Sequence, residues 1–126
     1  MRYPIAVVSL TLLLFSASAG AQESINGMWT GSSHQTAVGH LAYSTITMTI
    51  SGNGGTIDYP DLHCGGMIAR VGDGGSSGTF REHITHGMDK CADGGTITVR
   101  AHDSQLDWAW AGSSGKSVVA VLTRPQ

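Results

Sequence analysis

Short alternating segments separated by glycine-rich turns are the feature that most constrains how this chain folds. Glycine accounts for 18 of the 126 residues and gathers in small clusters such as 52–55, 72–75 and 112–115. Between the clusters, apolar and polar residues alternate, which is typical of strands with one buried face. The spacing of about 10 to 14 residues between turns suits consecutive antiparallel strands. The sequence therefore predicts an all-β chain.

About eight such segments follow one another, joined by short turns. Strands connected in sequence can remove their exposed edges by closing into a barrel, so an eight-stranded antiparallel barrel is the predicted fold, with a two-sheet sandwich as the alternative. Such a barrel either fills its interior with side chains or holds one small ligand. A polar loop is expected over 32–39. The predicted strands are 27–31, 41–51, 56–59, 65–71, 77–85, 96–101, 105–111 and 117–124.

The first 21 residues have the three parts of a secretory signal. Arg2 supplies a positive charge, residues 5–15 are mainly apolar, and small residues lead to Ala21. The apolar stretch is shorter than the 18 or more residues that a membrane span needs. We expect cleavage near Ala21, before Gln22, which leaves residues 22–126 as one periplasmic or secreted domain without membrane insertion.

The chain has two cysteines, Cys64 and Cys91. In an exported chain, two cysteines without C-x-x-C spacing predict a structural disulfide. In the chain-entropy model, closing this loop stabilises the fold by roughly 3.5 kcal/mol. The formal net charge is −2 and no basic stripe is present, which argues against a nucleic-acid partner.

Two segments look like family signatures. Residues 59–66 read YPDLHCGG and residues 80–95 read FREHITHGMDKCADGG. They resemble a poorly characterised bacterial extracytoplasmic domain with a Y-P-x-L-x-C-G-G pattern and a second pattern around the later cysteine. The resemblance implies a disulfide-linked β domain without an assigned reaction. The opening Gly27-x-Trp29 and the closing Leu122-x-Arg124 also resemble the ends of lipocalin- and avidin-type barrels.

Glu82 is the acidic residue of most interest. Strand alternation places it on one face with Phe80 and Ile84, so it is expected to face the core. A buried carboxylate must be paired, hydrogen-bonded or neutral. Arg124 lies on an inward face by the same parity, which predicts an internal ion pair between the two, with Arg70 as the less favoured partner. The alternative is a carboxylate that orients a ligand or takes part in catalysis at the floor of a cavity.

Aromatic residues are few, and several fall at inward-facing positions. Trp108 and Trp110 share one strand face, so both either fill the core or line a groove. An aromatic wall suits stacking on a flat ligand, and an exposed aromatic suits a protein interface. The candidate binding residues are Trp29, Tyr59, Glu82, Trp108, Trp110 and Arg124.

The six histidines raise the question of a metal site. His83-x-x-His86 would place the two rings on opposite faces of a regular strand, and no established zinc or copper spacing occurs. No nucleophile-elbow signature is present either. We therefore predict no metal, no cofactor and no catalytic residue. The histidines are His34, His40, His63, His83, His86 and His102.

Three functions remain open at this point. The first is an exported non-enzymatic binding protein that engages another protein, as an envelope inhibitor or immunity protein does. The second is a carrier of a small apolar or saccharide ligand, which requires an open cavity lined by Trp108, Trp110 and Glu82. The third is a small metal- or carboxylate-dependent enzyme, which requires several polar candidates to converge in one cleft.

Overall fold

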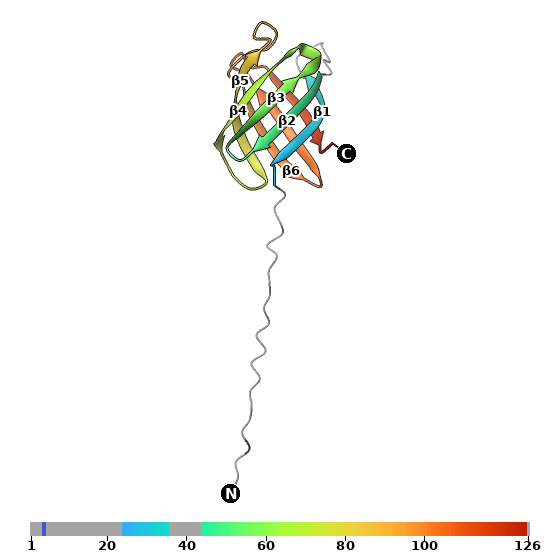
Figure 1. The fold of residues 1–126 in the computed structure, drawn as a ribbon, viewed down its shortest axis with the longest axis vertical. Coiled ribbons are helices and arrows are strands. Elements are labelled where there is room, and N and C mark those ends of the chain that lie inside the picture. The colour runs from blue at the N-terminus through green and yellow to red at the C-terminus, as the bar shows by residue number, and fades with distance from the viewer. Residues whose placement is uncertain (1–3, 5–23, 36–43, 126) are drawn as a thin grey trace.

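Eight antiparallel strands form a closed barrel in sequence order (Figure 1). The computed structural model describes residues 4, 24–35 and 44–125. The predicted barrel is therefore confirmed over the sandwich. Nearly all of the predicted leader 1–21, with its cleavage site near Ala21, lies outside the described residues. The strands are β1 Gly27–Gln35, β2 Ser44–Ser51, β3 Gly54–Tyr59, β4 Cys64–Gly72, β5 Ser77–His86, β6 Thr96–His102, β7 Gln105–Ala111 and β8 Ser117–Thr123.

The barrel closes where β1 pairs with both β2 and β8. Gly31 lies opposite Ile46 on one side and opposite Leu122 on the other. A Cβ atom at this glycine would lie 2.4 Å from the carbonyl oxygen of Val121. The missing side chain thus permits the close backbone approach between the first and last strands.

In the described part of the chain, no helix is long and apolar enough to cross a membrane.

The interior is lined by the alternating residues of each strand. In β2, β5 and β6 the alternate side chains are buried and their neighbours are more exposed. In β7 and β8 the alternation is the same except that Trp110 and Val118, near the open end, are only partly buried. Removing this apolar surface from water provides the main driving force for folding. Most of the core is aliphatic, and its fully buried members include Ile46, Met48, Ile50, Ile57, Ile84, Ile97, Leu106 and Leu122.

Two details differ from the sequence prediction. Strand β1 continues to Gln35, so residues 32–35 are strand rather than loop, while 36–43 lie outside the described residues. In β4, the alternation of Met67, Ala69 and Val71 indicates one apolar face. That face is turned outward, with Met67 58% and Val71 60% exposed. The buried alternate positions are Cys64, Gly66 and Ile68. A register shift between Gly65 and Gly66 interrupts the regular alternation of this strand.

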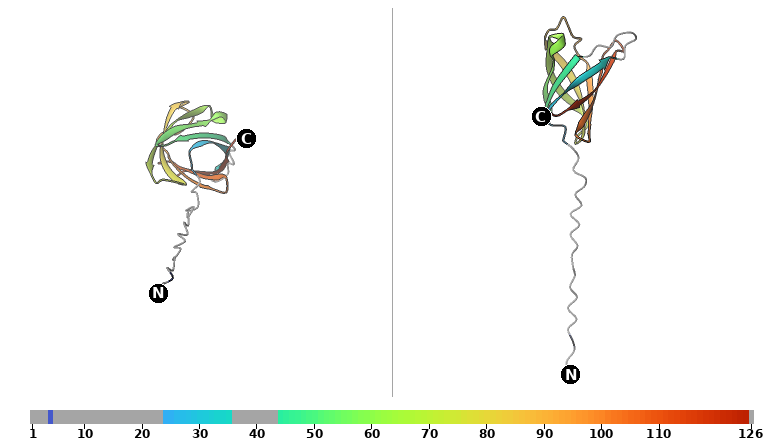
Figure 2. Two further views of the ribbon diagram at one scale, coloured as in Figure 1. Left: turned by 60° about the horizontal axis from the view of Figure 1, so that its bottom comes forward. Right: turned by 90° about the vertical axis from the view of Figure 1, so that its right-hand side faces the viewer.

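One end of the barrel is filled, and we call it the closed end. Ile25 is fully buried there and reaches β5, since a Cβ on Gly78 would lie 2.9 Å from Ile25 Cδ1. The Trp29 indole N–H donates to the Ile25 carbonyl oxygen at 2.9 Å. Arg124 stacks on the Trp29 ring, with its guanidinium carbon 4.0 Å from the ring centroid. Figure 2 shows the barrel narrowing toward this end.

The opposite end, which we call the open end, carries the disulfide. Cys64 at the start of β4 is bonded to Cys91 in the β5–β6 loop, as the sequence predicted. The short 3-10 helix η1 (Pro60–Leu62) and the β7–β8 turn lie at this end as well. The bridge fixes the β5–β6 loop to the neighbouring strand, so this loop forms a stable part of the barrel mouth.

Candidate functional site

A cavity of about 320 Å³ occupies the open end of the barrel. Tyr59, Trp108 and Trp110 form its aromatic walls, and Leu62 and Val118 add aliphatic surface. Four of the six candidate binding residues therefore meet in one place, since Glu82 also lines this cavity. The other two, Trp29 and Arg124, lie at the closed end.

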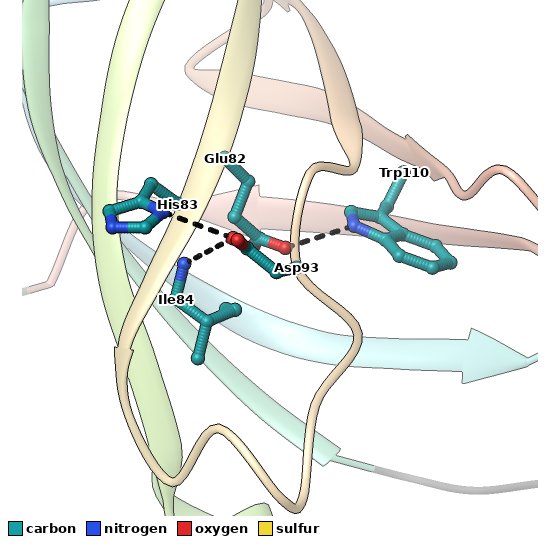
Figure 3. A network of polar contacts seen from close by, with 5 residues as sticks. All are labelled: Glu82, His83, Ile84, Asp93 and Trp110. Carbon is teal, nitrogen blue, oxygen red and sulfur yellow. Dashed lines mark hydrogen bonds and ion pairs between the residues drawn. The ribbon is translucent and has the colours of Figure 1, made fainter.

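Glu82 is buried and held by two neutral donors. Its side chain is only 2% exposed. The Tyr59 hydroxyl donates to Oε2 at 2.5 Å, and the Trp110 indole N–H donates to Oε1 at 3.1 Å (Figure 3). Burial raises the pKa of Glu82 above its ordinary value, and these two hydrogen bonds offset only part of that effect. Burial and the adjacent Glu82 carboxylate also raise the pKa of Tyr59.

The predicted ion pair between Glu82 and Arg124 is wrong. The Arg124 guanidinium instead donates to the carbonyl oxygens of Ser24 and Asn26, both at 2.8 Å. Parity placed Glu82 on the inner face correctly, but Arg124 follows the end of β8 and is exposed. Alternation also carries no information about height along the barrel. Arg124 follows the last strand at the closed end, whereas Glu82 lies toward the open end.

The aromatic walls are fixed by close packing. The Tyr59 and Trp108 rings meet edge to face, with centroids 6.5 Å apart and planes at 68°. The Trp110 indole lies against two glycines, because a Cβ at Gly95 would be 2.0 Å from its Nε1 and a Cβ at Gly112 would be 2.5 Å from its far edge. The absence of two side chains therefore sets the position of this wall.

The β5–β6 loop supports Glu82 from behind. The Glu82 backbone N–H donates to Gly95 O at 2.8 Å, and its carbonyl accepts from Gly94 N–H at 3.2 Å. Asp93 accepts the backbone N–H of Ile84 at 2.8 Å and lies 3.3 Å from His83 Nδ1 (Figure 3). The backbone hydrogen bond from Ile84 is the largest cause of the lowered pKa of Asp93. These contacts fix the carboxylate of Glu82 in the cavity wall.

Sequence reasoning missed two serines and two lysines of the site. Ser33 and Ser44 are buried, and their hydroxyls hydrogen-bond to each other at 2.8 Å. Lys90 and Lys116 are exposed residues at the cavity rim. Serine is frequent in this chain and the first of the pair fell in an expected loop, so no sequence signal distinguished them. Among the described residues, the buried polar side chains are Ser33, Ser44 and Glu82, and all three line this cavity.

Three histidines, His83, His86 and His102, lie beside carboxylates rather than beside one another. His86 Nε2 lies 3.3 Å from Asp58, and His102 Nε2 lies 2.9 Å from Asp107. The contact with Asp107 is the main cause of the raised pKa of His102. Within the part of the chain that the structure describes, no group of three or more His, Cys, Asp or Glu is placed to hold a metal ion.

Comparison of the chain with protein-family models and with curated proteins finds no match. The geometry of the cavity at the open end is therefore the basis for a functional assignment.

Proposed function

We propose that this chain is an exported, non-enzymatic binding protein that holds one small ligand in the cavity at the open end of the barrel. One observation carries the proposal: the three buried polar side chains of the described residues all line this cavity. Burying polar groups is unfavourable unless they are hydrogen-bonded. Their concentration around one hollow favours a binding site over an incompletely packed core.

The size and lining of the cavity restrict the ligand. A volume of about 320 Å³ lies at the lower end of the range for small-molecule sites, roughly 300–1,000 Å³. Three aromatic rings favour a flat, partly apolar molecule over a highly hydroxylated one. The buried Trp108 Nε1–H has no hydrogen-bond partner among the described residues.

The same geometry favours a small ligand over a protein partner. Tyr59 and Trp108 are 7% and 3% exposed, so neither ring is available as an anchor in a protein interface. The sequence suggests two segments for contact with a protein partner, 32–40 and 58–63. In the first of them, residues 32–35 belong to β1 and 36–40 lie outside the described residues. The other, 58–63, contains η1 and contributes Leu62 to the cavity rim.

The site offers little for catalysis. Glu82 is the one carboxylate in the described lining, and its contacts are with neutral groups. Reactions that use two carboxylates need a second acid at a defined distance. A binding role therefore suits the residues better than an enzymatic one.

Export and location remain part of the proposal. The leader pattern and the disulfide together support a periplasmic or secreted protein, since disulfides persist in oxidising compartments. The resemblance to a bacterial extracytoplasmic β domain and to lipocalin- and avidin-type barrels agrees with this placement.

The test is a titration of the purified, oxidised domain with 2-phenylethanol, a neutral molecule with a flat ring and one hydroxyl. We expect saturable binding of one equivalent, measured by calorimetry and by the change in tryptophan fluorescence. Val118→Trp fills the cavity and should abolish binding. Val119→Trp adds the same ring to the outer face of β8, where Val119 is 46% exposed, and should leave binding intact.

The proposal fails if the wild-type domain binds neither this alcohol nor charged molecules of the same shape saturably, or if Val118→Trp binds as well as Val119→Trp. Thermal unfolding of both variants establishes that each is folded before the comparison is made.

A further inference from the structure

We propose that the ligand of this cavity is a small monovalent organic cation, an amine with a short hydrophobic body whose ammonium group binds the Glu82 carboxylate. This inference rests on the proposed function and specifies its ligand class. The reasons are the unpaired charge of Glu82, its free acceptor sites, the surrounding aromatic rings and the charges at the rim.

The Glu82 carboxyl group has no cationic partner in the described structure. No Lys, Arg or His nitrogen of the described residues lies within 4.0 Å of its carboxylate. A buried carboxylate without a counter-charge is unfavourable, and a neutral residue would fill the same volume without that penalty. A cationic ligand supplies the missing partner.

The carboxylate also retains hydrogen-bonding capacity. An ionised carboxylate offers about four lone-pair sites, and Tyr59 and Trp110 each use one of them. An ammonium group in the cavity would donate to the remaining sites. Charge-assisted hydrogen bonds of this kind are shorter and stronger than neutral ones.

The aromatic walls suit a cation as well as an apolar body. The faces of Trp and Tyr rings carry negative electrostatic potential and attract ammonium groups within about 6 Å. Tyr59, Trp108 and Trp110 all line the cavity that contains Glu82. The combination of one carboxylate and several π faces matches an amine better than a neutral or acidic compound.

The rim limits the ligand to a single positive charge. Lys90 and Lys116 lie at the mouth and would repel a second cationic group there. The Lys90 side chain is 57% exposed, and its Nζ lies 3.9 Å from a carboxylate oxygen of Asp89. An anion at these lysines would remain in solvent and would face repulsion from Glu82.

The experiment compares three molecules of matched shape: 2-phenylethylamine, 2-phenylethanol and phenylacetate. The amine is cationic at pH 7, as an alkylamine with a pKa near 10 must be. We expect the amine to bind at least about tenfold more tightly than the alcohol, which corresponds to about 1.4 kcal/mol, and phenylacetate to bind most weakly. Calorimetry on the wild-type domain measures this order without any substitution.

Glu82→Gln removes the charge and keeps the shape. It should lose the tenfold preference for the amine over the alcohol, whatever its affinity for the alcohol alone. The matched control is Asp89→Asn, which removes an exposed negative charge next to Lys90, outside the cavity lining, and should keep the preference.

The outcomes separate this inference from the proposed function. If the alcohol or phenylacetate binds as tightly as the amine, or if Glu82→Gln keeps the preference, the ligand class is wrong while the cavity remains a binding site. If none of the three molecules binds, the proposed function fails together with the inference.

Discussion

The two ends of the barrel combine an indole with a charged side chain in opposite ways. At the closed end, Arg124 stays exposed, stacks on Trp29 and donates to two backbone carbonyl oxygens. At the open end, the charge is inside, and Glu82 accepts hydrogen bonds from Trp110 and Tyr59 beside a hollow. The closed end keeps its charge in water and fills its interior, so it contributes stability. The open end accepts a buried charge and a cavity, which stabilise the fold poorly and suit binding.

The strongest test of this contrast removes one tryptophan from each end. Trp29 is fully buried in the filled end, so Trp29→Ala should lower the free energy of unfolding by about 3–5 kcal/mol, the usual range for a buried aromatic. Trp110 is only partly buried and borders the cavity. Trp110→Ala should therefore cause a smaller loss and a larger defect in ligand binding. Urea unfolding and calorimetry measure both effects, and equal losses of stability would contradict the contrast.

A single added carbon should disturb the open end alone. A Cβ at Gly95 would lie 2.0 Å from Trp110 Nε1, so Gly95→Ala must displace the indole and weaken its hydrogen bond to Glu82. We expect a loss of about 1–3 kcal/mol, typical of overpacking, with reduced binding of 2-phenylethanol. Gly74 is the control, because a Cβ there meets nothing within 4 Å. If Gly74→Ala is equally harmful in thermal unfolding, steric contact with the indole is not the cause.

The buried acid should leave a smaller, pH-dependent signature. The pKa of Glu82 is raised in the folded state above its ordinary value of 4.5, so the folded protein binds this proton more tightly than the unfolded chain does. Stability from this source is fully present below the unfolded pKa and is lost as the pH rises through the folded pKa. The unfolding free energy of the wild type relative to Glu82→Gln should therefore fall with increasing pH, by about 1.4 kcal/mol for each pH unit between the two pKa values.

Asp93 and His102 provide the internal check on that measurement. The lowered pKa of Asp93 has the opposite sign, since its contribution is present above its unfolded pKa and is lost as the pH falls. The raised pKa of His102 contributes below its ordinary value of 6.5 and is lost as the pH rises through its folded pKa. His102 has its charged contacts with Asp103 and Asp107, so its contribution cancels in the difference between the two proteins. Asp93 also interacts electrostatically with Glu82 and raises the pKa of Glu82, so its contribution cancels only in part. A difference that is flat with pH would contradict the raised pKa of Glu82.

The barrel was predictable because alternation within each strand and the glycine turns between strands can be recognised from short stretches of sequence. Alternation around Phe80 and Glu82, and around Trp108 and Trp110, correctly gave the inward faces of β5 and β7. The inward face of β4 was not predicted. Gly66 points inward without contributing an apolar side chain, while the apolar Met67 lies on the outer face. A glycine has no side chain whose polarity could indicate which face of the strand is buried.

The site was only partly predictable because it depends on height along the barrel. Alternation states which face a residue occupies but not how far it lies from either end. Tyr59 and Glu82 were correctly recognised as candidates for one site. Arg124 was wrongly grouped with them, because alternation could not show that it lies at the closed end. The contact between Ser33 and Ser44 likewise depends on the height of each residue along the barrel and on the register of β1 against β2. Alternation provides neither of these.

The hydrogen bond between Arg124 and the Ser24 carbonyl oxygen, at 2.8 Å, has a practical consequence. The first described residue of the domain and its last strand finish side by side, away from the mouth. A tag or surface tether at either terminus would therefore orient the cavity toward the surrounding solution. Neighbouring termini also favour circular permutation, which would allow new chain ends to be introduced elsewhere in the barrel.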